Sequence, residues 1–260
     1  MCLFENIARL SLVFSIQTFK LQHYHLLPIL AEQHLLLIFA VNMPRKLIFF
    51  YNPISGTKSK KALLDLIRTK TNEQGLVFEI LETNAAGDYG YLTGKIKDEA
   101  VTDIIICGGD GTVNQVAGSL LHSNVNIGII PMGSGNGLAL AAGIPKKAEK
   151  ALEIIFKGNA SFIDGFYINH HFSCMLCGLG FDAQVAHDFA KQSERGLATY
   201  VKQTFRNFFS AKTYPFILDI NDNRIKTEAF FISVANSNQF GNNVTIAPQA
   251  SICDGLIDVV

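Results

Sequence analysis

Hydrophobic residues form continuous runs along the chain, and each run is followed by a turn and then by a stretch with helical spacing. The apolar runs lie at residues 47–51, 77–81, 103–107 and 126–130. The stretches with helical spacing lie at about 59–73, 89–99, 113–121 and 135–142. Because uninterrupted hydrophobicity is typical of strands covered on both faces, the pattern predicts an α/β fold with a doubly wound parallel sheet between two layers of helices.

The pattern changes after residue 158. Strand-like segments lie at 162–168, 171–176, 216–220, 226–235 and 255–260, and one long helical stretch at about 182–209 interrupts them. This succession predicts a second, mostly antiparallel, β-rich domain. We therefore expect an α/β domain over residues 44–157 and a β-rich domain over 158–260. Because the chain ends inside the last expected strand, we expect the second domain to be truncated.

Residues 1–43 continue neither pattern. Their apolar stretches are interrupted by Lys20, His23 and Glu32, and none reaches the roughly 20 residues that span a bilayer. Glu5 in the leading region and the lack of a small-residue cleavage pattern argue against a signal peptide. Met43 begins the segment Met-Pro-Arg-Lys-Leu-Ile-Phe-Phe, a natural start for the first expected strand, so our hypothesis is that residues 1–42 are an extension upstream of the natural start.

Composition narrows the classes of partner. The chain is 48% hydrophobic and 17% charged, which is typical of a folded globular protein, and it carries 22 basic and 22 acidic residues. Without a basic excess, we expect no nucleic-acid partner. The five cysteines are an odd number in apolar segments, which favours reduced thiols inside the cell, and Cys174 and Cys177 lack a second ligand pair for zinc.

A glycine-rich loop carries the strongest chemical signal. The run Gly108-Gly109-Asp110-Gly111-Thr112-Val113-Asn114 comes directly after an apolar strand and directly before a helical stretch. Glycines let the backbone approach an anion closely, and the helix N-terminus offers free N–H groups and a positive dipole end. Asp110 fits as a partner for a metal ion or for a donor that touches a nucleotide. The alternative is a plain glycine turn in which Thr112 caps the helix.

Three further strand ends carry small polar residues. Pro131-Met132-Gly133-Ser134-Gly135-Asn136-Gly137 repeats the construction of strand, glycine loop and helix, Asn52-Pro53-Ile54-Ser55-Gly56 follows the first strand, and Thr83 follows the second. In an open parallel sheet the carboxyl ends of neighbouring strands share one crevice, so these loops can face one ligand. The lysines after the first strand fit a solvated helix face as well as a phosphate contact.

The motif set is neither a Walker A loop nor a dinucleotide fingerprint, because no GxxxxGK[ST] occurs and no GxGxxG follows the first strand. NPxSG, GGDGTxN and PxGSGN at these spacings instead resemble the catalytic domain of the diacylglycerol kinase superfamily, especially bacterial lipid kinases, with sphingosine kinases as relatives. The resemblance covers about residues 44–260 and continues at Gly178-Leu179-Gly180-Phe181-Asp182, Val234-Ala235-Asn236 and Asp254-Gly255-Leu256.

The resemblance implies a two-domain enzyme that moves the γ-phosphoryl group of ATP to the hydroxyl of a membrane lipid such as diacylglycerol or a sphingoid base. The residues that match the family's ATP contacts are Asn52, Thr83, Gly108, Gly109, Asp110, Gly111, Thr112, Val113, Asn114 and Ser134. Its Mg²⁺ site maps to the carbonyls of Ser251 and Leu256 and the carboxylate of Asp254. Asp110 is the residue expected to be essential for turnover. In the family, the proposed proton acceptor lies several tens of residues after the aspartate that corresponds to Asp254. We therefore expect the general base beyond Val260.

Several points stay open at the level of sequence. The family commonly has Glu at Gln115 and Thr-Ala-Asn at Ser134-Gly135-Asn136, so the lipid head group is not fixed. A soluble-substrate kinase of NAD kinase type and a catalytically incomplete nucleotide-binding remnant are the alternatives.

We expect a cytoplasmic protein with peripheral contact at the inner membrane face. The segment 200–209 either touches lipid or packs its aromatic face on the core. The oligomeric state is open, a homodimer included.

Overall fold

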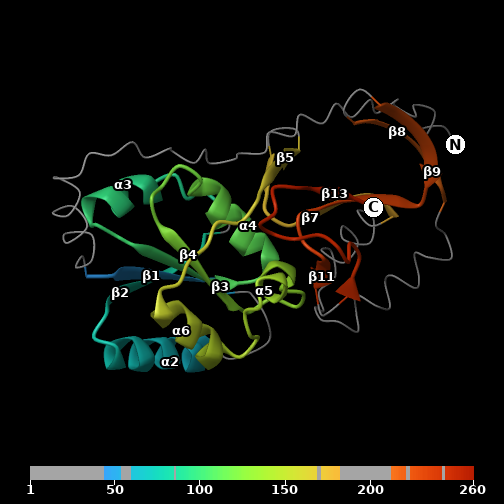
Figure 1. Cartoon of the computed structure of the whole chain (residues 1–260). Helices are drawn as coiled ribbons and strands as arrows, with labels where there is room; N and C mark the ends of the chain where they lie inside the picture. The colour runs from blue at the N-terminus through green and yellow to red at the C-terminus, as the bar shows by residue number, and fades with distance from the viewer. Residues whose placement is uncertain are drawn as a thin grey trace, which may run out of the picture.

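The computed structural model describes residues 44–53, 60–84, 86–168, 171–181, 212–220, 223–241 and 244–260. Figure 1 shows an α/β part on one side of the molecule and a β-rich part on the other. The N-terminal extension, the helical stretch expected at about 182–209 and the aromatic segment 200–209 within it lie outside the described residues.

The α/β part is built on four parallel strands in the order β2-β1-β3-β4. Their bounds are β1 (Lys46–Tyr51), β2 (Val77–Glu82), β3 (Asp103–Gly108) and β4 (Asn126–Pro131). The chain passes from β1 outward to β2 and then crosses to the other side of β1, so the strand order reverses between β1 and β3. In doubly wound sheets a ligand binds outside the carboxyl ends of the strands at such a reversal.

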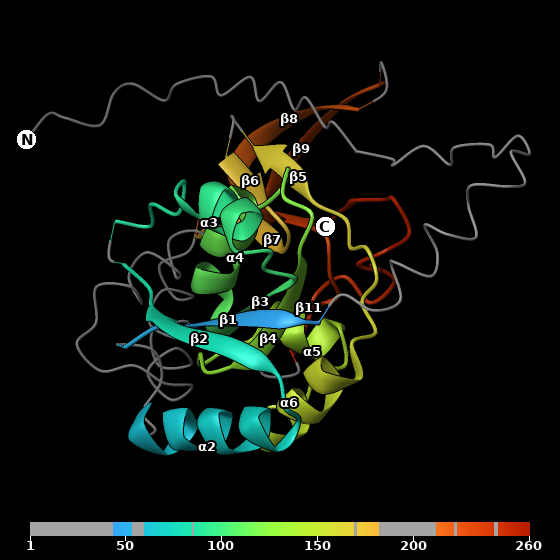
Figure 2. The same ribbon diagram turned by 90° about the vertical axis from the view of Figure 1, so that its left-hand side faces the viewer.

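Five helices belong to this part, namely α2 (Lys60–Glu73), α3 (Leu92–Asp98), α4 (Asp110–Ser119), α5 (Gly137–Ala141) and α6 (Ala148–Lys157). Figures 1 and 2 show α3 and α4 on one face of the sheet and α2 and α6 on the other. This arrangement confirms the predicted α/β sheet between helix layers. Only α6 had no counterpart among the stretches predicted to be helical.

Alternate residues of the central strands feed two separate hydrophobic cores. On β1, Ile48 and Phe50 pack with the residues of α3 and α4, whereas Leu47 and Phe49 pack with those of α2 and α6. All four side chains are fully buried. Both faces of β1 are therefore apolar because both are covered by helices, which explains why its sequence shows no alternation.

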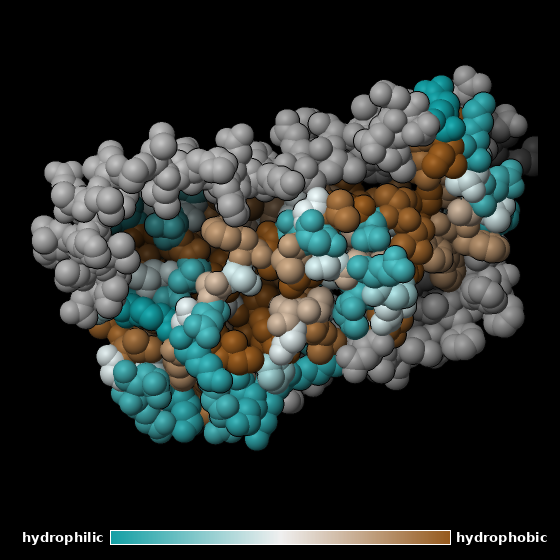
Figure 3. Space-filling view, in the orientation of Figure 1, coloured by the Kyte–Doolittle hydropathy of each residue, from teal (hydrophilic) through white to brown (hydrophobic). Residues whose placement is uncertain are grey.

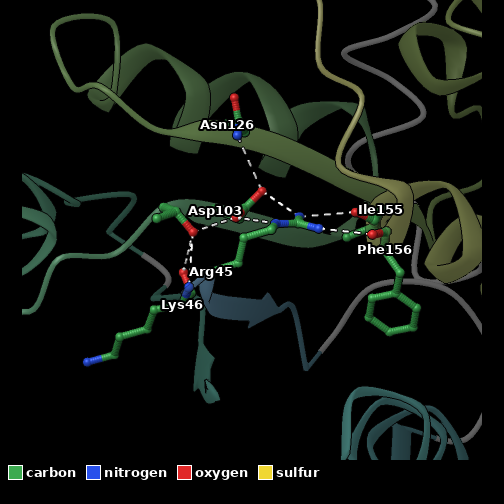
Figure 4. Close-up of polar contacts among 7 residues, drawn as sticks. Arg45, Lys46, Asp103, Asn126, Ile155 and Phe156 are labelled. Carbon is green, nitrogen blue, oxygen red and sulfur yellow. Dashed lines mark hydrogen bonds and ion pairs between the residues drawn. The ribbon is translucent and has the colours of Figure 1, made fainter. Parts of the chain in front are cut away.

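An ion pair fixes the edge of the sheet where the strands begin (Figure 4). The guanidinium of Arg45 donates to both carboxylate oxygens of Asp103, at 3.0 and 2.7 Å, and to the carbonyls of Ile155 and Phe156 at 3.0 and 3.1 Å. The side chain of Asp103 is only 4% exposed. These bonds hold together the start of β3, the residue before β1 and the last turn of α6. They lie at the end of the strands away from the glycine loops.

The β-rich part consists of short antiparallel strands. Its elements are β5 (Phe166–Ile168), β6 (His171–Ser173), β7 (Leu176–Gly180), β8 (Tyr214–Ile220), β9 (Asn223–Ala229), β10 (Phe231–Ala235), β11 (Gln239–Gly241), β12 (Val244–Thr245) and β13 (Asp258–Val259). They pair as β13-β10-β7, β5-β6, β8-β9 and β11-β12. The antiparallel character confirms the prediction for this half of the chain.

Two predicted strands of the β-rich part are each divided in the structure. The segment predicted at 171–176 is broken between β6 and β7, and the one at 226–235 is broken at Phe230 between β9 and β10.

On the face shown in Figure 3, hydrophilic residues gather over α2 and hydrophobic residues gather toward the β-rich part. Among the described residues, no helix combines the length and the hydropathy needed to cross a bilayer.

Candidate nucleotide site

The ends of the four parallel strands are joined to one another by backbone hydrogen bonds. The amide of Asn52 donates to the carbonyl of Cys107 at 3.1 Å, and that of Thr83 donates to Tyr51 at 3.0 Å. The amide of Met132 donates to the carbonyl of Gly108 at 2.9 Å. The loops after β1, β2, β3 and β4 therefore begin side by side at one edge of the sheet, as the sequence predicted.

Asn52 and Thr112 link the loop after β1 to the loop after β3. The side-chain Nδ2 of Asn52 donates a hydrogen bond of 3.0 Å to the hydroxyl of Thr112, which lies in the first turn of α4. These two residues flank the point between β1 and β3 where the strand order reverses. The structure thus brings together two predicted ATP contacts that lie 60 positions apart in the sequence.

The two glycine loops touch through their backbones. A Cβ atom built on Gly133 would lie 2.6 Å from the Cα of Gly109, and one built on Gly109 would lie 3.0 Å from the Cα of Gly133. Gly135 contacts Gly241 of β11 in the same way, because a Cβ on Gly241 would lie 2.8 Å from the Cα of Gly135. A side chain would not fit at either contact, so the backbones of the two loops can approach each other closely there.

The second glycine loop is held in shape by Asn136. This residue adopts the left-handed conformation, with φ of 56° and ψ of 44°, and is 5% exposed. Its Oδ1 accepts from the amide of Gly133 at 2.8 Å, and its Nδ2 donates to the carbonyl of Gly133 at 2.7 Å. No role was predicted for Asn136 from the sequence. The signal that could have found it is that asparagine tolerates the left-handed region better than other residues with a Cβ, apart from aspartate.

Asp110 in the first glycine loop reaches the helix that follows the second one. It is the first residue of α4, and its Oδ1 accepts a hydrogen bond of 3.3 Å from the amide of Leu138 at the start of α5. A carboxylate is stabilised at a helix N-terminus by the free amides and the dipole of the helix. The amides of Asp110, Gly111 and Thr112 have no carbonyl partner within α4, whose first helical bond runs from Val113 to Gly109. The first turn of α4 therefore combines amides that have no partner among the described residues with one fixed negative charge.

The buried Cys174 lies close to this charge from the side of the β-rich part. Burial is the main cause that raises the pKa of its thiol to about 12, and the charges of Asp110 and Cys177 raise it further. Cys174 therefore stays a neutral thiol at physiological pH and adds no charge next to Asp110.

Asn114, Val113 and Ser134 differ in how they could meet a nucleotide. The side-chain amide of Asn114 donates to the carbonyl of Phe172 at 2.9 Å and accepts from the amide of Cys174 at 3.0 Å, so it joins α4 to β6. The side chain of Val113 is 3% exposed and belongs to the core. Ser134 is exposed within the second glycine loop. The side chains of Asn114 and Val113 are thus taken up by contacts within the protein, and the amide of Val113 donates to the carbonyl of Gly109.

The turn predicted to hold Mg²⁺ lies at the end of the β-rich part. The Oδ1 of Asp254 accepts from the amide of Leu256 at 3.0 Å, and the amide of Gly255 donates to the carboxylate of Asp164 at 2.7 Å. Asp254 and Leu256 are exposed, and Ser251 is half-buried. A set of two carbonyls and one carboxylate consists of the hard oxygen donors that Mg²⁺ prefers, so these residues fit the ion. No cluster of three or more histidine, cysteine or acidic side chains suited to a metal occurs in the described ranges.

Comparison with known proteins agrees with this architecture. Residues 46–168 match the family described as "Diacylglycerol kinase catalytic domain", and residues 176–260 match the family described as "YegS C-terminal NAD kinase beta sandwich-like domain". A crystal structure of a diacylglycerol kinase from Bacillus anthracis strain Sterne has the same fold, with a TM-score of 0.66 at 23% identity over 83% of this chain and 74% of that one.

Curated relatives match this chain with similar sequence identities. A protein of Enterobacter sp. strain 638 named "Probable lipid kinase YegS-like" is 27% identical over 79% of this chain and 71% of its own length, and a Yersinia pestis protein of the same name is 28% identical over 84% and 74%. An uncharacterized Synechocystis protein is 27% identical over 80% of this chain, which spans only 51% of that relative. The fold and the two family matches define a protein with an α/β part and a β-rich second part, of the class that contains the diacylglycerol kinases. The chain belongs to the diacylglycerol kinase catalytic-domain superfamily, in its bacterial lipid kinase branch.

Proposed function

We propose that the chain binds ATP at the carboxyl edge of its parallel sheet and transfers the γ-phosphoryl group to the hydroxyl of a membrane lipid. The observation that carries this proposal is the close backbone contact between Gly109 and Gly133. A residue with a Cβ atom at either position would clash with the other loop. The first of these loops leads into the N-terminus of α4, and the amides of the first helical turn can bind a chain of phosphates there. The names of the relatives support a lipid as the acceptor.

Each residue has a separate task in this proposal. The free amides of the first turn of α4 bind phosphate oxygens, and Asn52 and Thr112 hold the loops after β1 and β3 at a fixed separation. Thr83 closes the same edge from β2. Asp110 orients the donors of both loops through its bond to Leu138 and supplies the negative charge that faces a nucleotide-bound cation. Phosphoryl transfer depends mainly on such positioning and on charge neutralisation.

Ser251, Asp254 and Leu256 are the residues that would hold the Mg²⁺ implied by the family. When bound, the ion supplies positive charge next to the phosphates or fixes the turn that carries it. Asp254 already shapes the turn by accepting from the amide of Leu256, and Asp164 anchors it through the amide of Gly255. We also propose that the α/β domain over 44–157 carries the nucleotide and that the β-rich domain over 158–260 faces the lipid during peripheral contact with a membrane.

A direct assay tests the proposal. The full chain is incubated with Mg²⁺ and γ-labelled ATP against a panel of lipid alcohols in mixed micelles, with diacylglycerol and a sphingoid base among them. The expected result is label in a lipid phosphate, lost in Asp110→Asn. NAD serves as a second acceptor, because the β-rich part matches a family described as NAD kinase-like. Label in NAD and in no lipid would overturn the lipid assignment, and nucleotide binding without transfer to any acceptor would favour a catalytically incomplete protein.

A further inference from the structure

A series of buried and partly buried hydrogen bonds connects the glycine loop of α4 with the Asp254 turn through the β-rich part. Its members are Asn114, Cys174, Asn236, Asp164 and Gly255. We call these residues the amide relay. They come from distant parts of the sequence, since the hydrogen bond between Gly255 and Asp164 alone joins residues that are 91 positions apart.

The first link is made by Asn114. Its Nδ2 donates to the carbonyl of Phe172 and its Oδ1 accepts from the amide of Cys174, so it occupies one edge of β6 while β5 pairs with the strand along the other. An asparagine amide offers one donor group and one acceptor group, which matches the exposed carbonyl and amide of a strand edge. α4 is therefore fixed to the segment 172–174.

The second link is made by Asn236, which directly follows β10 and is fully buried. Its Nδ2 donates to the carbonyl of Cys174 at 3.1 Å and to that of Asp164 at 2.7 Å, and its backbone amide donates to Met175 at 3.1 Å. Its Oδ1 is buried and has no hydrogen-bond partner within the described part of the chain. The cost of burying that oxygen is offset by the two Nδ2 bonds, because in each of them Nδ2 donates to a carbonyl that would otherwise lack this donor.

The third link is made by Asp164. Its backbone amide donates to the carbonyl of Ile252 and its carboxylate accepts from the amide of Gly255, both at 2.7 Å. These bonds hold the turn at 252–255 from two sides. The relay thus runs from α4 to the segment 172–175, then through Asn236 to Asp164, and ends at the turn that contains Asp254.

We propose that Asn236 is a positioning residue, and that through the amide relay it keeps the Asp254 turn and the glycine loop of α4 in a fixed relative place. Contiguous packed or hydrogen-bonded groups can carry coupling of this kind, and here each step is a specific bond between named atoms. The consequence for nucleotide affinity rests on the proposed function, whereas the structural coupling can be measured without any nucleotide.

Hydrogen–deuterium exchange of the full chain tests the coupling directly. Asn236→Asp keeps the shape of the side chain but turns an acceptor toward the carbonyls of Cys174 and Asp164, so both bonds are lost. Exchange is expected to rise in peptides covering 172–175, 251–257 and 108–114, with no rise in β1. Ser233→Ala is the matched control, because Ser233 lies in β10, is fully buried, and has an Oγ with no partner among the described residues. Unchanged exchange at 108–114 in Asn236→Asp would overturn the proposal.

Asp164→Ala provides the second variant, in case the buried charge of Asn236→Asp prevents folding. It removes only the carboxylate at the far end of the relay, on a half-buried residue. Exchange should rise at 251–257, and the dissociation constant for ATP should rise about tenfold, while Ser233→Ala changes neither. Loosening of the turn with unchanged ATP affinity would contradict the relay. Failure of the wild-type chain to bind ATP would instead contradict the proposed function and leave the exchange result to decide on the relay.

Discussion

The carboxylate of Asp110 accepts a hydrogen bond of 3.3 Å from the amide of Leu138, and so one acidic side chain joins the two glycine loops of the parallel sheet. Its Oδ2 lies on the side of Gly135, where an added Cβ would approach it to 3.2 Å. The residue therefore has a structural contact as well as a charge, and the two contributions can be separated by substitution.

Asp110→Asn keeps an oxygen that can accept from Leu138 but removes the charge. We expect phosphoryl transfer to fall by about a hundredfold or more, with a melting temperature close to that of the wild type. Asp110→Ala removes both, and should lower the free energy of unfolding by a further ~1 kcal/mol in urea denaturation. Equal activity of Asp110→Asn and the wild type would show that the charge has no part in turnover.

Gly133→Ala tests the contact between the glycine loops. The new Cβ would lie 2.6 Å from the Cα of Gly109, so the two backbones must separate. We expect a loss of about 1–3 kcal/mol of stability and a weaker affinity for ATP, measured by thermal denaturation and calorimetric titration. Gly94→Ala in α3 is the control, because a Cβ there meets nothing within 4 Å. That variant should gain about 0.5–1 kcal/mol and bind ATP normally.

Arg45→Met tests the ion pair at the opposite edge of the sheet. It leaves the carboxylate of Asp103, 4% exposed, without its charged partner. Since breaking a buried pair is costly, we expect a loss of about 2–4 kcal/mol, discounted slightly because Arg45 itself is partly exposed. The double variant Arg45→Met/Asp103→Leu should recover much of this loss. At temperatures where Arg45→Met is folded, its Michaelis constant for ATP should match the wild type, and a large increase would contradict the separation of the two edges.

The lowered pKa of the Glu99 carboxyl should make the stability of the fold depend on pH in the acid range. Hydrogen bonds from Lys46 and Lys95, both at 2.7 Å, lower the pKa of its carboxyl from 4.5 to about 2. Because the folded pKa is the lower one, the stabilising contribution is complete above pH 4.5 and is lost as the pH falls from 4.5 toward 2. Melting temperatures over this range should therefore decline less steeply in Glu99→Gln than in the wild type. Lys46→Met should reduce the slope in the same direction, and identical slopes in all three proteins would refute the assignment.

The sheet and its loops were predictable because their signal is local. Continuous apolar runs at 47–51 and 103–107 became strands with buried interiors, and the glycine run after the second of them became the loop that leads into α4. α6 was not predicted as a helix, although its buried residues Ala151, Leu152 and Ile155 follow helical spacing. The strands near residues 174 and 230 were predicted as continuous, because a break between two apolar strands leaves little trace in hydropathy.

By itself, the sequence determined the α/β class, the strand ends that carry the loops, and the residue types that can approach a phosphate chain. Only the tertiary structure decided that Asn114 joins α4 to β6, that Asn136 holds its own loop, and that Asn236 reaches both Cys174 and Asp164. The physical reason is that backbone periodicity and glycine placement act over a few neighbouring residues, whereas the partner of a buried amide is set by how distant segments pack against one another.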